Sequence, residues 1–417
     1  MFLNKKIAYF PLKTILGFLI FSEALFWIGP KDYNIDNGVI LFFYLLILNL
    51  AFYIGYRNGY VRFKPSKIKI SSLGYKLWIY AGLIVTFISA LMFLKARGWS
   101  FSLSTLIASM SNPGEAYYTD TDEDALHSSN YFSVMLSPIK WATLPLGVYF
   151  WDKLSNFYKL LVILTFLIGL FVSLCSGVRK GLADTILIVI FCIIARIPNL
   201  IIIKKKRRKL QLYSISAIII FLIYFIYSNI SRSGGDGFES LSFFDISNIK
   251  SVYLDYLPFP LVIALAFITS YLCQGYFALA KGLSYGILSP TIFGSSFFLI
   301  RIAKDICGYD PTPDTYMWIL QENEGISITI NWHTLYLWLA NDFTFLLVPI
   351  IIYYIGYFFS KTWCDAVYGK NAYAYPTFCL FLIMSFYCFA NNQIFSFSFI
   401  PFFFWIILYY FSKHKVS

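Results

Sequence analysis

The amino-acid sequence predicts an all-α, polytopic integral membrane protein, a bundle of ten to twelve transmembrane helices. Of its 417 residues, 59% are hydrophobic and only 13% are charged, whereas soluble domains carry about 25% charged residues. Ten apolar runs approach the roughly 20 residues that a helix needs to cross a bilayer. We expect a single membrane domain with two external segments, an acidic loop at 96–130 and a large loop at 229–333.

The ten apolar runs define the expected membrane helices. They cover approximately 12–28, 38–55, 75–94, 131–151, 160–175, 182–197, 212–227, 334–359, 375–390 and 394–411. Two weaker runs, 257–280 and 285–302, contain Pro and Gly and are expected to form an interrupted hairpin within the large external loop. Because these two runs come as a pair, either ten or twelve spans leave both termini on the same side.

The basic residues predict the orientation of the chain. The net charge is +12, but Lys and Arg sit mainly in short turns between apolar runs. Placing the N-terminus in the cytoplasm puts most of these turns inside, as the positive-inside rule requires. The run KKKRRK at 204–209 is interpreted as a cytoplasmic turn, and no nucleic-acid partner is expected. The first apolar run lacks a small-residue cleavage site and is expected to stay as an anchor.

The cysteines and the clustered acidic residues give only weak indications of a metal site or a disulfide framework. The seven cysteines are an odd number without CxxC spacing, so they indicate neither a disulfide framework nor a metal site. The acidic cluster in YYTDTDEDALH contains closely spaced carboxylates that suit a divalent cation. It lacks the spacing and central Gly of an EF-hand, which favours a solvated loop. No metal and no cofactor are expected.

The turn SGVRKG, residues 176–181, is the first candidate for chemistry. Arg179 and Lys180 lie at the external ends of two spans, against the orientation bias. The arginine fork suits phosphate oxygens, and Ser176 and Gly177 let backbone amides approach an anion. The turn is therefore either a phosphate clamp or a pair of snorkelling side chains at a helix end.

Two further arginines belong to the large external segment. Arg232 follows the end of a span, and Arg301 lies near the end of the expected hairpin. If both converge with Arg179 over the outer leaflet, they would neutralise a diphosphate. Each charge-assisted hydrogen bond would contribute about 1.5–3 kcal/mol.

The segment NWHTLYLWLANDF, residues 331–343, is the third candidate. A neutral imidazole at His333 could accept a hydroxyl proton, although boundary histidines are more often interfacial side chains. Asp342 lies about two helical turns inside the expected span, where a carboxylate needs a cavity or a partner. Glu23, within the first span, is a similar case without a visible partner. The sequence contains no P-loop, GxSxG, HExxH or dinucleotide fingerprint, so any reaction must use energy stored in a substrate.

These motifs resemble those of the oligosaccharide repeat-unit polymerases, the Wzy-type O-antigen and capsule polymerases of bacteria. SGVRKG is similar to the family's SGxR motif. NWHTLYLWLANDF is similar to its NxxT followed by an Asp-Phe pair, and YLCQGYFALAKGL followed by PTIFG also fits the external region. Thr344 stands where the family commonly has Gly.

The resemblance implies a membrane glycosyltransferase on the outer face of the bacterial cytoplasmic membrane, with both termini cytoplasmic. It would polymerise undecaprenyl-diphosphate-linked oligosaccharide repeat units, with membrane lipid around it and a chain-length regulator protein as a candidate partner. The 257–302 hairpin would then cover the lipid diphosphate as a lid. A flippase for the same lipid-linked oligosaccharides, an O-antigen ligase-like transferase and a membrane acyltransferase remain alternatives.

The resemblance also implies roles for the candidate residues. Arg179 and Arg232 would bind the diphosphate and stabilise the charge that develops on it, and His333 would abstract a proton or position the acceptor. The residues expected to support substrate binding are Ser176, Lys180, Tyr276, Arg301, Asn331 and Asp342.

Overall fold

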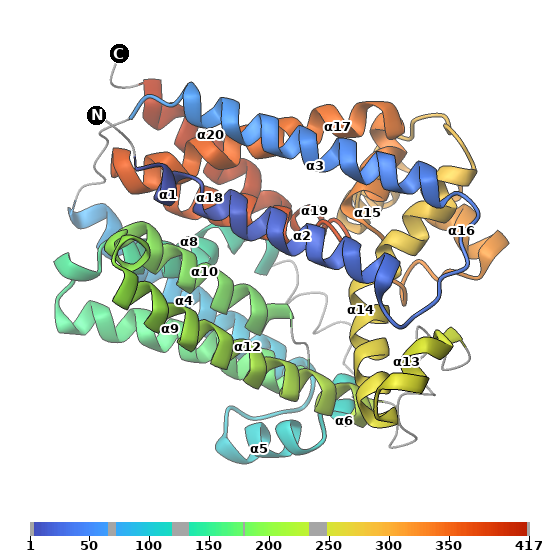
Figure 1. Ribbon diagram of the computed structural model, residues 1–417. Coiled ribbons are helices and arrows are strands. Elements are labelled where there is room, and N and C mark those ends of the chain that lie inside the picture. The colour runs from blue at the N-terminus through green and yellow to red at the C-terminus, as the bar shows by residue number, and fades with distance from the viewer. Residues whose placement is uncertain (1–3, 66–71, 119–132, 178–179, 233–247, 415–417) are drawn as a thin grey trace.

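The computed structural model describes residues 4–65, 72–118, 133–177, 180–232 and 248–414, which fold mainly as α-helices (Figure 1). The one β pairing among these residues is an isolated bridge between Lys31 and Ile249. Within these described residues, seven helices are long and apolar enough to cross a membrane. The predicted all-α polytopic membrane fold is therefore confirmed.

Every predicted run except 285–302 contains a helix that covers most of it. The seven long helices are α2 (Phe10–Ile28), α3 (Gly38–Val61), α4 (Ser72–Ala96), α9 (Asn156–Cys175), α12 (Lys204–Arg232), α14 (Phe259–Ser284) and α17 (Leu335–Cys364). Four shorter helices complete the bundle, α8 (Ser137–Tyr149), α10 (Lys180–Arg196), α18 (Ala374–Phe386) and α20 (Phe399–His414). The connections carry α1 (Lys5–Ala8), α5 (Leu103–Ser111), α6 (Pro113–Tyr118), η1 (Trp151–Lys153), α11 (Asn199–Ile202), α13 (Ser251–Tyr256), α15 (Phe297–Cys307), η4 (Thr312–Asp314), α16 (Tyr316–Glu324), η5 (Asp365–Gly369) and α19 (Gln393–Phe397).

Helices α3 and α17 pack closely against each other. A methyl group added at Gly55 would lie 2.0 Å from the carbonyl oxygen of Tyr353, and one at Gly356 would lie 2.5 Å from that of Phe52. Gly59, one turn after Gly55, approaches α17 in the same way. In a bilayer, small residues let helix backbones come together where no hydrophobic force drives association. These contacts fix the C-terminal half of α17 against α3.

Helix α14 differs most from the sequence expectation. It is one continuous helix of 26 residues, because Pro260 lies in its first turn, where a helix accepts proline without losing a hydrogen bond. It runs crosswise to α2 (Figure 1), and Asn37 before α3 donates to its Ala280 carbonyl at 2.6 Å. The second arm of the expected hairpin is a loop followed by the 11-residue α15. In place of a hairpin, the structure has a crosswise helix and a long loop.

Both chain termini lie at the same end of the helices (Figure 1). Two ion pairs lie at this end: Arg196 pairs with Asp152, and Lys413 pairs with Asp365 at 2.9 Å. The run 204–209 is helical, unlike the predicted turn, since α12 begins at Lys204. The SGVRKG turn lies at the opposite end of α10 from Arg196, which separates this candidate site from the basic end.

Helix α17 is interrupted at Thr344. This residue has φ 57 and ψ 160, a conformation that essentially only glycine adopts without strain. We expect Thr344→Gly to raise the free energy of unfolding by about 1–2 kcal/mol, because glycine accepts this conformation. Thermal unfolding in detergent would measure the change. In the regular helix α9, the control Thr165→Gly should instead lower stability by about 1 kcal/mol or more; a loss at both positions would contradict the interpretation.

Candidate functional site

The SGVRKG turn is tied to the segment that follows α18. Ser176 caps the C-terminal end of α9, and Gly177 follows at φ 62, a left-handed conformation common after helices. Lys180 begins α10, where its ammonium group pairs with Asp184 and lies 5.4 Å from the ring centroid of Tyr387. The predicted phosphate turn therefore contacts a segment more than 200 residues later in the chain.

Asp184 and Tyr387 are members of the site that the sequence analysis missed. Burial and then the charge of Asp184 raise the pKa of the Tyr387 hydroxyl well above its ordinary value, so this hydroxyl keeps its proton at neutral pH. The spacing of Lys180 and Asp184, four residues apart on a helix, is a signal that could have identified the pair. Nothing local in the sequence indicates Tyr387.

The residues from Tyr387 to Asn391, here called the 387–391 loop, also hold the NWHT segment. The side-chain oxygen of Asn391 accepts hydrogen bonds from the His333 backbone N–H at 2.9 Å and from Trp338 Nε1 at 3.1 Å. The Cys388 carbonyl accepts from the Leu335 N–H at 2.9 Å. The loop thus contacts both segments that carry the resemblance, SGVRKG through Tyr387 and NWHT through Asn391.

His333 lies fully buried beside this loop. Neither ring nitrogen makes a hydrogen bond of ordinary geometry, which is rare for a buried polar side chain. Burial lowers its pKa to about 4, and the Asn331 backbone opposes this shift only in part. The imidazole is therefore neutral at pH 7 and has a nitrogen able to accept a proton.

Aromatic side chains surround the start of the NWHT segment. The Trp332 ring lies 4.8 Å from that of Tyr271 and stacks on Phe389 at 6.0 Å between centroids. Its backbone N–H donates to the Gln274 side-chain oxygen at 3.0 Å. Asn331, predicted to bind substrate, accepts from the Ser327 N–H at 2.9 Å. In the structure Asn331 therefore closes a turn that leads into the site.

Asp342 lies inside α17, and its carboxylate accepts three hydrogen bonds. One carboxylate oxygen accepts from Thr291 Oγ1 at 2.9 Å and from the Gly294 N–H at 2.7 Å; the other accepts from the Ser295 N–H at 3.0 Å. The same loop holds Phe293 at φ 71, a conformation that bulky residues avoid. Asp342 thus fixes the shape of the 290–296 loop.

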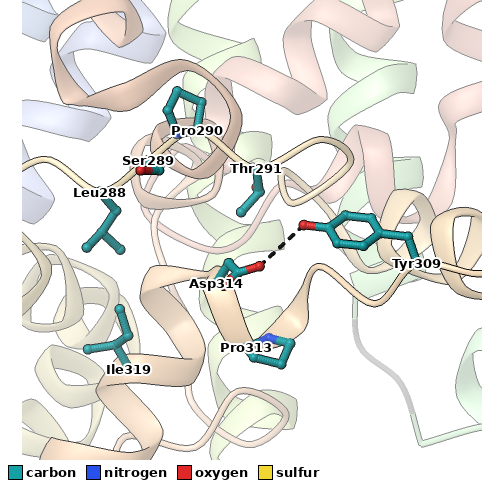
Figure 2. A pocket seen from close by; sticks show the side chains of 8 residues that line it. All are labelled: Leu288, Ser289, Pro290, Thr291, Tyr309, Pro313, Asp314 and Ile319. Atoms are coloured by element: carbon teal, nitrogen blue, oxygen red, sulfur yellow. Dashed lines mark hydrogen bonds between the residues drawn. The ribbon is translucent and has the colours of Figure 1, made fainter.

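A cavity of about 370 Å³ lies next to this loop. Figure 2 shows Leu288, Ser289, Pro290 and Thr291 on one side, facing the segment that carries Tyr309 and Asp314. The Tyr309 hydroxyl donates to Asp314 at 3.3 Å. Because Thr291 both lines the cavity and binds Asp342, the carboxylate inside α17 positions one cavity wall. Hydroxyls, a carboxylate and an aromatic ring are groups that suit a polyhydroxylated ligand.

No protein-family model, curated protein or solved structure matches this chain. In the part of the chain that the structure describes, no group of three or more His, Cys, Asp or Glu is placed to hold a metal ion. The acidic cluster at residues 120–124 lies outside the described residues.

Two of the predicted diphosphate ligands cannot be placed. Arg179 lies outside the described residues, between Gly177 and Lys180, which are described. Arg232 is the last residue of α12, and its side chain also lies outside the described part. Next to it, the Ser231 hydroxyl accepts from the Gly114 N–H at 3.1 Å, which ties the end of α12 to α6.

The other predicted residues have structural partners. Arg301 is exposed and pairs with Asp305 on its own helix at 3.2 Å. Tyr276 is fully buried, and its hydroxyl lies 2.8 Å from Ser22 Oγ, a contact that joins α14 to α2. Glu23 accepts two hydrogen bonds from the Asn49 amide at 2.9 and 2.8 Å, which supplies the partner that the sequence did not reveal.

Proposed function

We propose that this protein is a membrane glycosyltransferase that polymerises undecaprenyl-diphosphate-linked oligosaccharide repeat units on the outer face of the bacterial cytoplasmic membrane. The observation that carries the proposal is the 387–391 loop, which contacts Lys180 of the SGVRKG turn and His333 of the NWHT segment. Glycosyl transfer from a diphosphate uses a cation near the leaving diphosphate and a base that accepts the hydroxyl proton. Lys180, which is paired with Asp184, and the neutral imidazole of His333 both lie next to this loop.

The position of this site also supports the proposal. Lys180 begins α10, while Arg196 at the other end of that helix lies with the basic residues near the chain termini. Under the positive-inside rule, that basic end faces the cytoplasm. The site then faces the outside of the cell, where no nucleotide sugars are present. A sugar linked to a lipid diphosphate is already activated and needs no cofactor.

In the proposed reaction, a hydroxyl oxygen of the acceptor sugar attacks the anomeric carbon of the growing glycan. A new C–O bond forms, the bond from that carbon to the diphosphate oxygen breaks, and the hydroxyl proton passes to a ring nitrogen of His333. Undecaprenyl diphosphate leaves with the bond electrons, and Arg179 with Lys180 stabilises its added charge. The 387–391 loop has to move during the cycle, since His333 is fully buried.

The cavity beside the 290–296 loop is the proposed place for sugars of the acceptor unit. Its lining offers the Asp314 carboxylate as an acceptor for sugar hydroxyls and the Tyr309 ring as an apolar face. Thr291 lines this cavity and donates a hydrogen bond to Asp342 of α17. The cavity is thereby attached to the helix that begins just after His333.

The test is polymer formation by the purified protein. In detergent, with lipid-linked repeat units and no other protein, we expect a ladder of glycan lengths. A flippase has no compartment to transport into under these conditions and produces no ladder. An absence of polymer from stable, monodisperse protein would overturn the proposal.

Arg179→Ala tests the role of the SGVRKG turn. We expect the rate of ladder formation to fall by about a hundredfold or more, as when one preorganised donor to a developing anion is removed. In cells, single repeat units should then replace long chains, as gel analysis of the surface glycan would show. The matched control Arg62→Ala removes an exposed arginine at the basic end and should leave the ladder unchanged. A normal ladder from Arg179→Ala would disprove this role.

A further inference from the structure

A second cavity lies along the membrane-spanning helices. It has a volume of about 580 Å³ and runs between α17 and α20 with α18 beside it. Its lining is mostly apolar and includes Phe343, Tyr354, Phe381, Phe402 and Ile406. Several of the large side chains along it, among them Tyr354 and Phe403, are exposed on the surface of the helices. The cavity is thus a groove open to the hydrocarbon of a bilayer.

The groove is longer than one lipid leaflet. Its lining extends along α17 from Leu335 to Lys361, across the interruption at Thr344. At 1.5 Å per residue this stretch is at most about 39 Å long. The hydrocarbon core of a bilayer is about 30 Å thick, and the headgroup regions bring this to about 40–45 Å. One end of the groove therefore lies at the depth of lipid headgroups near the chain termini, and the other near His333.

The two ends differ in charge. Lys361 and Lys413 line the end near the chain termini. Lys413 pairs with Asp365 at 2.9 Å, whereas the ammonium group of Lys361 lies 4.5 Å from the centroid of the Tyr357 ring and makes no ion pair among the described residues. This end therefore keeps a net charge of about one positive unit. At the other end, Asn392 is already engaged, since its amide donates to the Ser295 carbonyl at 2.9 Å.

We propose that this groove is a binding site for an anionic phospholipid of the cytoplasmic leaflet. An acyl chain lies along α17 and α20, and the phosphodiester rests at Lys361 and Lys413. The apolar lining suits the chain, and one uncompensated positive charge matches one phosphodiester. A polyprenyl carrier with its diphosphate at the outer site would place its charge at the Asn392 end, where no cation lines the groove within the described residues. The lipid site is independent of the proposed glycosyl transfer.

Native mass spectrometry of the detergent-solubilised protein tests the site with three probes, phosphatidylglycerol, phosphatidylethanolamine and undecaprenyl phosphate. We expect phosphatidylglycerol to bind about fivefold more tightly than phosphatidylethanolamine, since one basic residue near a lipid headgroup contributes about that factor. Lys361→Gln should remove this preference, and Lys361→Arg should keep it. Ile406→Trp, which fills the groove, should weaken binding of both phospholipids. Lys153→Gln alters another lysine that lies over an aromatic ring, Phe150, outside the groove, and should change nothing.

Three results would overturn the site. The first is equal binding of the two phospholipids to the unaltered protein. The second is an unchanged preference in Lys361→Gln. The third is tighter binding of undecaprenyl phosphate than of phosphatidylglycerol that is lost in Ile406→Trp, which would assign the groove to a carrier lipid. The comparison of probes on the unaltered protein needs no variant, so it stands even if Lys361→Gln or Ile406→Trp fails to fold.

Discussion

Replacing Asp342 with Ala is expected to lower the free energy of unfolding by about 2–5 kcal/mol, because two buried backbone N–H groups and one hydroxyl lose their acceptor. These donors belong to Thr291, Gly294 and Ser295, all of them buried. The 290–296 loop would then lose the contact that holds Phe293 at positive φ. Because this loop walls the cavity beside Asp314, we expect polymer formation to fall as well. Thermal unfolding in detergent and the ladder assay would measure the two effects.

Graded substitutions separate this role from a general effect of charge. Asp342→Asn keeps one side-chain oxygen and should cost less than Asp342→Ala, while Thr291→Val removes only one of the three donors. Asp305→Ala breaks an exposed ion pair and should change stability by less than about 1 kcal/mol. If Asp342→Ala is as stable as Asp305→Ala, the carboxylate does not hold the loop.

Hydropathy predicted most of the fold because a bilayer leaves a backbone few choices other than helix. Helix α14 shows where that reasoning fails. Its apolar length is that of a span, but its direction across α2 is set by contacts with residues far away in the sequence, such as Ser22 and Asn37. Pro and Gly were interpreted as interruptions, although Pro260 sits where a helix tolerates it. Length and composition do not specify direction.

The candidate site was predictable only in its local parts. Thr344 was noted in the sequence only as a departure from the resembled motif, and its positive φ was not predicted. The Lys180 and Asp184 pair follows helical spacing. In contrast, Tyr387 and Asn391 bring two distant motifs together from a segment with no motif of its own. Such contacts arise from how α10, α17 and α18 pack.

Replacing His333 with Leu is expected to have opposite effects on stability and on activity. Both ring nitrogens are buried without a good hydrogen-bond partner, and an unsatisfied buried polar group costs about 1–3 kcal/mol. We therefore expect His333→Leu to leave the free energy of unfolding unchanged or to raise it at pH 7. The same variant should slow polymer formation by about a hundredfold to ten-thousandfold, the usual contribution of a general base. Such a trade-off is typical of a residue retained for function.

The pH dependence of stability provides an independent measurement. The folded pKa of His333 is about 4 and its ordinary value is 6.5, so between these values the unfolded chain binds a proton that the folded protein does not. Stability should therefore fall as the pH drops from 6.5 toward 4, by up to about 3 kcal/mol from this residue. His333→Leu should remove that part of the slope, whereas the unaltered protein should show none of it above pH 6.5. A His333→Leu variant with the same pH slope, lower stability and a normal ladder would make His333 a packing residue, and the proton of the acceptor hydroxyl would need another destination.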